Sequence, residues 1–284
     1  MKIAYLMHCN QPFDEIVENI NQLIKQQDHV FVMINEQSRR EEISFAFGED
    51  NRVHISNKAE FAQEGDMSLA RGTIFQLKEA CDMNCFDYYI NLTDGMIPIK
   101  NRNEIINILK QNKDFYEVYK DELTNPEMKE EFKRFTFFTN IPDFDNKSFT
   151  KKLSKGMGNL AYKIGFKRDN EVFLIKGSPY FMLRHQTARV LADNLPFVAD
   201  TFKLLNYAED YYIPTMIKHF IGEDDHINNN YHIVGPDGHW IENQGSKKIT
   251  RETILKHPDA LFAGRIFVND DLTLYEDYFE TYNN

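Results

Sequence analysis

The first 34 residues combine two apolar runs with one amphipathic stretch, and this pattern constrains the fold more than any other feature of the chain. Residues 2–7 and 29–34 are apolar runs, and residues 13–27 repeat apolar side chains at helical spacing. Strands without polar alternation are typical of parallel sheets that helices cover on both faces. The opening therefore predicts a β-α-β unit in which Asn10 and Asn35 follow the carboxyl ends of neighbouring strands, where open α/β sheets bind nucleotides.

The same alternation continues along the first part of the chain. The spacing predicts a helix over 68–85, a strand over 88–92 and a helix over 102–111. We therefore expect an α/β fold with a mainly parallel central sheet flanked by helices. No break in composition marks a linker, so we expect a single domain.

The second part of the chain has weaker signals. Residues 117–168 are charged and irregular, which favours a surface insertion. A strand is predicted over 171–175, a turn at 177–180, and a helix that begins near His185. Further short elements are predicted as a helix over 209–220, a strand over 231–234 and a helix over 251–256.

Charge and composition exclude several classes of protein. The chain carries 33 Lys and Arg against 44 Asp and Glu, a formal charge of −11, so we expect no nucleic-acid partner. The first 13 residues turn polar too soon for a signal peptide or membrane anchor, and no clear amphipathic anchor is predicted. Cys9, Cys81 and Cys85 lack the partners of a metal site and indicate a reducing compartment. We expect a cytoplasmic protein with at most peripheral contact with the inner face of the cell membrane.

Five short motifs point to one family when they are taken in order. They are AYLMH at 4–8, YINLTDGMIPIK at 89–100, GSPYF at 177–181, EDYYIPT at 209–215 and LFAGR at 261–265. Their order resembles the core-2/I-branching β-1,6-N-acetylglucosaminyltransferase family, which includes peptide O-xylosyltransferases and many bacterial enzymes. The resemblance implies a GT-A-like fold, a bacterial member, an inverting mechanism, a UDP-sugar donor and no divalent metal cofactor. It divides the single glycosyltransferase domain, 1–284, into a nucleotide-binding half, 1–112, and an acceptor and catalytic half, 113–284.

Two departures from the family pattern leave the donor sugar open. Family members often have His and Asp at the end of the second strand, where this chain has Met33 and Asn35. They also have an acidic residue after the glycine that matches Gly95, where this chain has Met96.

An inverting transfer needs a base for the acceptor hydroxyl and cations for the departing diphosphate. By the resemblance Asp210 takes the position of the base, with Glu209 beside it as the rival. Without the resemblance, both would be read as solvated carboxylates at a helix start. The residues that the resemblance places around the donor are Arg265 and Lys248 as a phosphate clamp, with Arg251 and Lys247 as alternatives, and His8, Asn35 and Asp94 near the nucleotide-sugar.

For the acceptor, we expect Ser178 and Tyr180 from the GSPYF motif, Glu117 and Arg134 from the charged segment, and Trp240, whose indole could stack on a sugar ring. The partners are then a nucleotide-sugar donor, with N-acetylglucosamine or another UDP-linked sugar, and a glycan or lipid-linked glycan acceptor. The expected role is the synthesis of surface polysaccharide or glycoconjugate.

Two alternatives stay open. Asp143 and Asp145 form an Asp-x-Asp sequence, which in metal-dependent GT-A enzymes holds the divalent ion that bridges the diphosphate. The altered strand ends are also compatible with an inactive relative that only binds a glycan or a partner enzyme.

Overall fold

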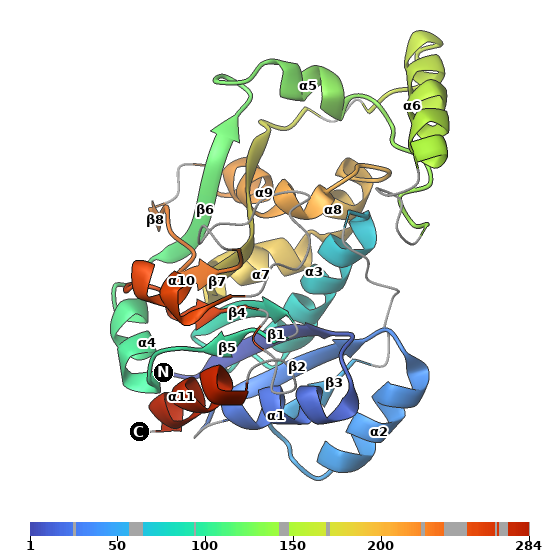
Figure 1. Ribbon diagram of the computed structural model, residues 1–284. Helices are drawn as coiled ribbons and strands as arrows, with labels where there is room; N and C mark the ends of the chain where they lie inside the picture. The colour runs from blue at the N-terminus through green and yellow to red at the C-terminus, as the bar shows by residue number, and fades with distance from the viewer. Residues whose placement is uncertain are drawn as a thin grey trace.

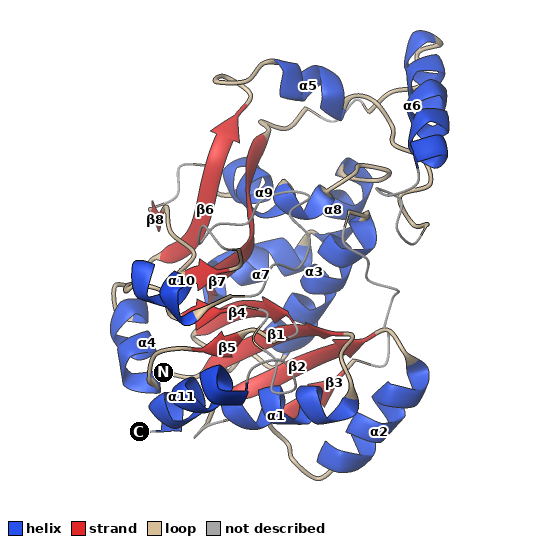
Figure 2. Cartoon of the chain, viewed as in Figure 1, coloured by secondary structure: helices blue, strands red, loops and turns tan. Residues whose placement is uncertain are grey.

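A seven-stranded mixed sheet with helices on both faces forms the centre of the protein in the computed structural model (Figures 1 and 2). The structure describes residues 1–24, 27–56, 65–93, 95–141, 148–168, 171–222, 225–235, 249–264, 266 and 272–283. The strands of this sheet, in their spatial order, are β3 (Val53–Ile55), β2 (His29–Ile34), β1 (Ile3–Cys9), β4 (Tyr88–Thr93), β7 (Ile175–Arg184), β6 (Asp114–Asp121) and β8 (His226–Ile227).

The strand directions confirm a mainly parallel sheet. β1, β2, β3 and β4 pair in parallel, and β8 is parallel to β6. β7 pairs antiparallel with both β4 and β6, so it alone runs against the other strands of this sheet. The strands that follow residue 112 continue the sheet begun by the first half of the chain, as expected for a single GT-A-like α/β domain.

A small second sheet joins distant parts of the sequence. Its strands are β5 (Ile97–Pro98), β10 (Phe262–Ala263) and β9 (His232–Ile233), in that order. β10 pairs antiparallel with β5 and parallel with β9, which brings the second and last motifs of the chain side by side.

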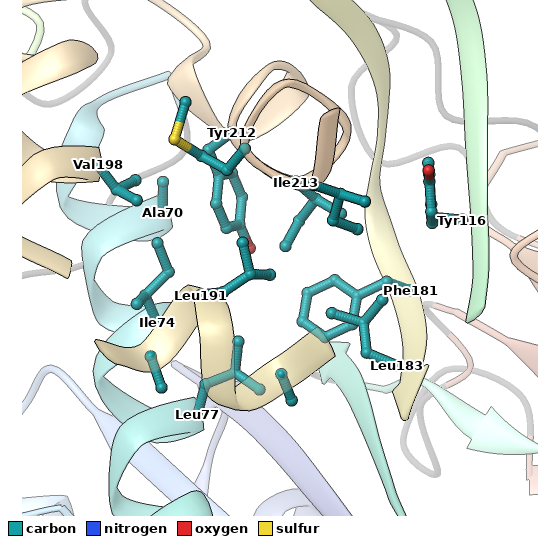
Figure 3. Packing of buried hydrophobic residues seen from close by; sticks show 14 of the residues in the cluster. Ala70, Ile74, Leu77, Tyr116, Phe181, Leu183, Leu191, Val198, Tyr212 and Ile213 are labelled. Atoms are coloured by element: carbon teal, nitrogen blue, oxygen red, sulfur yellow. The ribbon is translucent and has the colours of Figure 1, made fainter. Parts of the chain in front are cut away.

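Helices cover both faces of the large sheet. Their bounds are α1 (Phe13–Leu23), α2 (Gln37–Phe47), α3 (Met67–Asp82), α4 (Arg102–Leu109), α5 (Glu127–Phe132), α6 (Ser148–Lys163), α7 (His185–Asp193), α8 (Leu195–Thr201), the 3₁₀ helix η2 (Ala208–Asp210), α9 (Tyr212–Phe220), α10 (Arg251–Lys256) and α11 (Leu272–Asn283). α5 and α6 lie beyond the end of β6 (Figure 1). Figure 3 shows the core on one face, where α3, α7 and α9 pack against β7 through residues such as Ile74, Leu191, Ile213 and Phe181. On the other face α1 and α4 cover the strands through Ile16, Ile20, Ile105 and Leu109.

Continuous burial of the first strands explains why the first half follows its sequence pattern. Every residue of β1 and β2 is buried, as the apolar runs predicted. The helix expected over 13–27 ends at Leu23, and the one expected over 68–85 spans Met67–Asp82. Asn10 and Asn35 were predicted to follow the carboxyl ends of neighbouring strands. This prediction is confirmed, because the residues before them, Cys9 in β1 and Ile34 in β2, pair with each other.

The reading of 117–168 as an irregular insertion is wrong. Its first residues belong to β6, and α5 and α6 follow. The charged residues of β6 lie where burial of the strand falls off toward its end, so their polarity concealed a strand of the central sheet.

The expected strand over 171–175 and turn at 177–180 are also wrong, because β7 begins only at Ile175 and runs through the motif. Pro179 is tolerated there because the pairing of β6 with β7 is irregular between Val118 and Tyr116, opposite this part of β7.

Among the described residues, no helix combines the length and apolar character that crossing a bilayer requires.

Candidate active site

A cluster of polar side chains lies where β6 and β7 meet η2. Lys176 Nζ lies 3.1 Å from Asp210 Oδ2, and the exposed fractions of the two side chains are 12% and 1%. The same ammonium lies 5.6 Å from the centre of the Tyr211 ring. We call Glu117, Tyr119, Lys176, Ser178 and Asp210 the Asp210 cluster.

Tyr119 connects the members of the Asp210 cluster. Its hydroxyl donates to Glu117 Oε2 over 3.3 Å and lies close to the Ser178 side chain. Tyr119 is 40% exposed, and the partial burial of its ring, together with the charges of Glu117 and Asp210, raises its pKa. Tyr119 therefore stays neutral at physiological pH and keeps its proton for donation to a carboxylate or a sugar oxygen.

Asp210 reaches this place because the start of α9 is tied to the start of β7. Thr215 Oγ1 accepts a hydrogen bond from the Ile175 amide and donates one to the Ile175 carbonyl, both over 3.0 Å. Tyr207 adopts left-handed backbone angles, with φ of 54°, immediately before η2. These constraints place Asp210, at the end of η2, against the residue that follows Ile175 in β7.

Glu209 has a different environment from Asp210. Its Oε1 accepts a hydrogen bond from the Gly65 amide over 2.5 Å, and its side chain is buried. Glu209 thus ties η2 to the segment that precedes α3, whereas Asp210 belongs to the cluster on β6 and β7.

Gly177 allows β6 and β7 to approach each other at the cluster. A Cβ atom there would lie 2.0 Å from the Glu117 carbonyl oxygen and 3.4 Å from Pro214 in α9. Because real Cβ atoms do not approach backbone so closely, no larger residue fits without a shift of the strand.

Asn91 in the second motif fixes the central part of β7. Its Nδ2 donates to the Pro179 carbonyl over 2.9 Å, and its Oδ1 accepts from the Phe181 amide over 2.6 Å. The amide thus acts on β7 as a neighbouring strand would, beside a proline that has no N–H to donate.

Tyr180 is buried between the two sheets. Its ring stacks on His232, with centroids 5.5 Å apart, and His232 stacks in turn on Phe262 at 5.0 Å. Burial lowers the pKa of His232 to about 4, so this imidazole is neutral in the stack.

His8, near the end of β1, points toward α3. Its Nε2 lies 3.2 Å from Thr73 Oγ1, and a Cβ atom on Gly72 would lie 2.9 Å from its ring. Burial lowers the pKa of His8 to about 4. His8 is therefore a neutral group at the end of the sheet where Asn10 and Asn35 lie.

Several other candidate residues have partners away from the Asp210 cluster or lie outside the described part of the chain. Arg251 forms an ion pair with Asp277 in α11. The Arg134 guanidinium lies 5.2 Å from the centre of the Tyr162 ring in α6. The candidates outside the described residues are Asp94, Asp143, Asp145, Trp240, Lys247, Lys248 and Arg265.

The structure therefore brings together Glu117, Ser178 and Asp210, which the sequence suggested from separate segments. It adds Lys176 and Tyr119, which sequence reasoning missed. Strand alternation could have found Lys176, because positions 176, 178 and 180 share one face of a strand. Within the described residues, no three His, Cys, Asp or Glu side chains are grouped so that they could hold a metal ion.

Comparison with known proteins identifies the family. The family model described as Branch, Core-2/I-Branching enzyme, matches residues 3–257, which is most of the chain. A comparison with curated proteins finds no match. The matched region includes every residue of the Asp210 cluster, and the chain belongs to the core-2/I-branching enzyme family of glycosyltransferases.

Proposed function

We propose that this chain is an inverting glycosyltransferase that transfers a sugar, N-acetylglucosamine or another UDP-linked sugar, to an acceptor hydroxyl without a divalent metal. The acceptor is a glycan or lipid-linked glycan used in the synthesis of surface polysaccharide or glycoconjugate. The observation that carries the proposal is the Asp210 carboxylate, which lies beside Lys176 within the region that the family model matches.

In this mechanism Asp210 accepts the proton of the acceptor hydroxyl as that oxygen bonds to the anomeric carbon of the sugar. The bond from the anomeric carbon to the diphosphate breaks, and UDP leaves with its electron pair. Lys176 pairs with the Asp210 carboxylate and fixes its orientation before the transfer. The hydroxyls of Tyr119 and Ser178, together with Glu117, hydrogen-bond the acceptor.

The preference for Asp210 over Glu209 rests on their contacts. Glu209 accepts a backbone hydrogen bond from Gly65, and its role in the proposal is to fix η2. Arg265 and Lys248 remain the proposed partners of the departing diphosphate, and Arg251, Lys247, His8, Asn35 and Asp94 remain further candidates around the donor. Tyr180, Arg134 and Trp240 remain candidates for acceptor binding.

The variant Asp210→Asn tests the proposal. It keeps the shape of the side chain but removes the base, so turnover should fall by about 10²–10⁴-fold while UDP-sugar binding is retained. UDP release with a panel of donors measures turnover, and a thermal shift with the same donors measures binding. The control is Glu209→Gln, whose amide oxygen can still accept from Gly65 and which should keep most of the turnover.

Unchanged turnover in Asp210→Asn would remove Asp210 from the mechanism. A wild-type protein that binds donors yet releases no UDP with any acceptor would favour the inactive relative. Loss of wild-type turnover in excess chelator, restored by manganese, would favour the metal-dependent alternative with Asp143 and Asp145.

A further inference from the structure

α6 presents an unusual row of exposed apolar side chains. These are Phe149, Leu153, Met157, Leu160 and Ile164, with exposed fractions of 77%, 45%, 38%, 62% and 75%. Their spacing of three or four residues puts them on one stripe of the helix surface. Ile164 continues this stripe beyond the end of α6, because its amide still donates to the Leu160 carbonyl. We call these five residues the α6 stripe.

Another side of α6 attaches the helix to the rest of the protein. Ser154 and Ala161 are buried, and a Cβ atom on Gly158 would lie 2.4 Å from the Phe135 carbonyl oxygen. Tyr162 donates to Glu130 in α5 over 2.7 Å. Because the helix already has a packed side, the α6 stripe is a second apolar surface that the fold leaves uncovered.

The charged residues of the segment that carries the α6 stripe are all basic. Residues 148–168 contain five lysines and one arginine and no acidic residue, although the whole chain has a formal charge of −11. Lys152, Lys155, Lys163 and Lys167 are exposed and form no ion pair with any described residue. The segment is therefore a local basic surface on an acidic protein.

The position of α6 leaves the stripe accessible. Figure 1 shows α6 with α5 at the edge of the molecule, beyond the end of β6 and on the opposite side from α1, α2 and α11. With 16 residues, α6 has a length of about 24 Å, which suits a helix that lies along a surface.

We infer that α6 docks this protein on a membrane surface that contains anionic phospholipid. The acyl region of one leaflet can cover the α6 stripe, and lipid phosphates can bind Lys152 and Lys163, which flank the stripe on the side away from the packed residues. The methylene stems of these lysines can lie against the acyl region while their ammonium groups stay among the lipid headgroups. A second copy of the chain fits less well, because pairing two α6 stripes would bring the lysines of both copies together.

This inference differs from the expectation, drawn from the sequence alone, that no clear amphipathic anchor is present. It does not depend on the proposed reaction, because docking involves no donor, acceptor or catalytic residue. If the acceptor is lipid-linked, docking also concentrates the enzyme where that acceptor lies.

Sedimentation of the full chain with vesicles tests the docking. Wild type should bind vesicles of phosphatidylcholine with phosphatidylglycerol, and binding should weaken with phosphatidylcholine alone or at high salt. Phe149→Ser combined with Leu160→Ser should lower the partition coefficient about tenfold or more. Lys152→Gln and Lys163→Gln should each lower it about fivefold.

Phe45→Ser is the matched control, because Phe45 in α2 is 94% exposed and lies outside α6. It should bind vesicles as wild type does. All the altered side chains are exposed, so circular dichroism and the melting temperature should stay near those of wild type.

Absence of wild-type binding to the anionic vesicles would overturn the inference, as would unchanged binding of the Phe149 and Leu160 double variant. A concentration-dependent dimer that this variant abolishes, without vesicle binding, would assign the stripe to a second copy instead. No donor or acceptor enters the assay, so its outcome is independent of whether the proposed transfer is correct.

Discussion

Replacement of Lys176 by methionine should destabilise the protein through the carboxylate that it leaves behind. The Asp210 side chain is only 1% exposed, and Lys176 Nζ at 3.1 Å is the cation beside it. Breaking a buried ion pair from one side costs about 3–5 kcal/mol. Because Asp210 has further contacts and the Lys176 side chain is 12% exposed, we expect a value near the lower end of this range.

A double-mutant cycle separates the pair from its surroundings. Asp210→Asn should lower the free energy of unfolding less than Lys176→Met does. The lysine that remains in Asp210→Asn can reach solvent, whereas the carboxylate that remains in Lys176→Met cannot. In the double variant neither charge is left buried, so its loss of stability should be smaller than the sum of the two single losses by about 1–3 kcal/mol.

Urea denaturation followed by circular dichroism measures the free energy of unfolding of the four proteins. Additivity of the two single changes within about 0.5 kcal/mol would refute the reasoning, because it would mean that the two charges do not interact. In that case Lys176 would also lose its assigned role in orienting the Asp210 carboxylate.

Two further predictions concern the fold. Gly177→Ala should lower the melting temperature strongly or prevent folding, because its Cβ atom would lie 2.0 Å from a backbone oxygen of β6. Gly156→Ala in α6 is the control, since nothing lies within 4 Å of the added atom, and it should raise the free energy of unfolding by about 0.5–1 kcal/mol. Stability should also fall between pH 6.5 and about 4, because His8 and His232 have pKa values of about 4 when folded and an ordinary value of 6.5 when unfolded. The unfolded chain binds these protons first, so each histidine can remove up to about 3 kcal/mol as the pH falls, and urea titrations at several pH values that give equal stability would contradict this.

The sequence predicted the first half of the fold well because local burial and sheet position agree there. β1 and β2 are buried along their whole length, so their apolar runs predict buried strands directly.

One helix in the second half was also predicted with its bounds. α10 matches its expected range of 251–256, and the N-cap Thr250 accepts a hydrogen bond from the Thr253 amide.

β6 and β7 were missed because their stability comes from contacts distant in sequence. Gly177 and Pro179 normally indicate a turn, but here Gly177 pairs with Val118 of β6 and the side-chain amide of Asn91 donates to the Pro179 carbonyl, so both lie in a strand. No local pattern reveals a partner that lies nearly 90 residues away.

The candidate site was predictable only in part for a similar reason. The motif residues Ser178 and Asp210 were found, and Glu117 joins them through Tyr119. Lys176 was missed because it lies between the expected strand over 171–175 and the expected turn at 177–180. The α6 stripe was missed because the lysines and glycines between its members concealed the helical repeat.

The small sheet has a practical consequence for shortened versions of this protein. The family match ends at residue 257, yet β10 at Phe262–Ala263 pairs with β5 and β9. Ile97 and Ile233 are almost fully buried in the cluster that Ala263 and Leu274 complete. A protein shortened to end at residue 257 would lack β10, so the strand edges that β10 covers and the side chains of Ile97 and Ile233 would face water. Aggregation of such a protein would not show whether the enzyme is active.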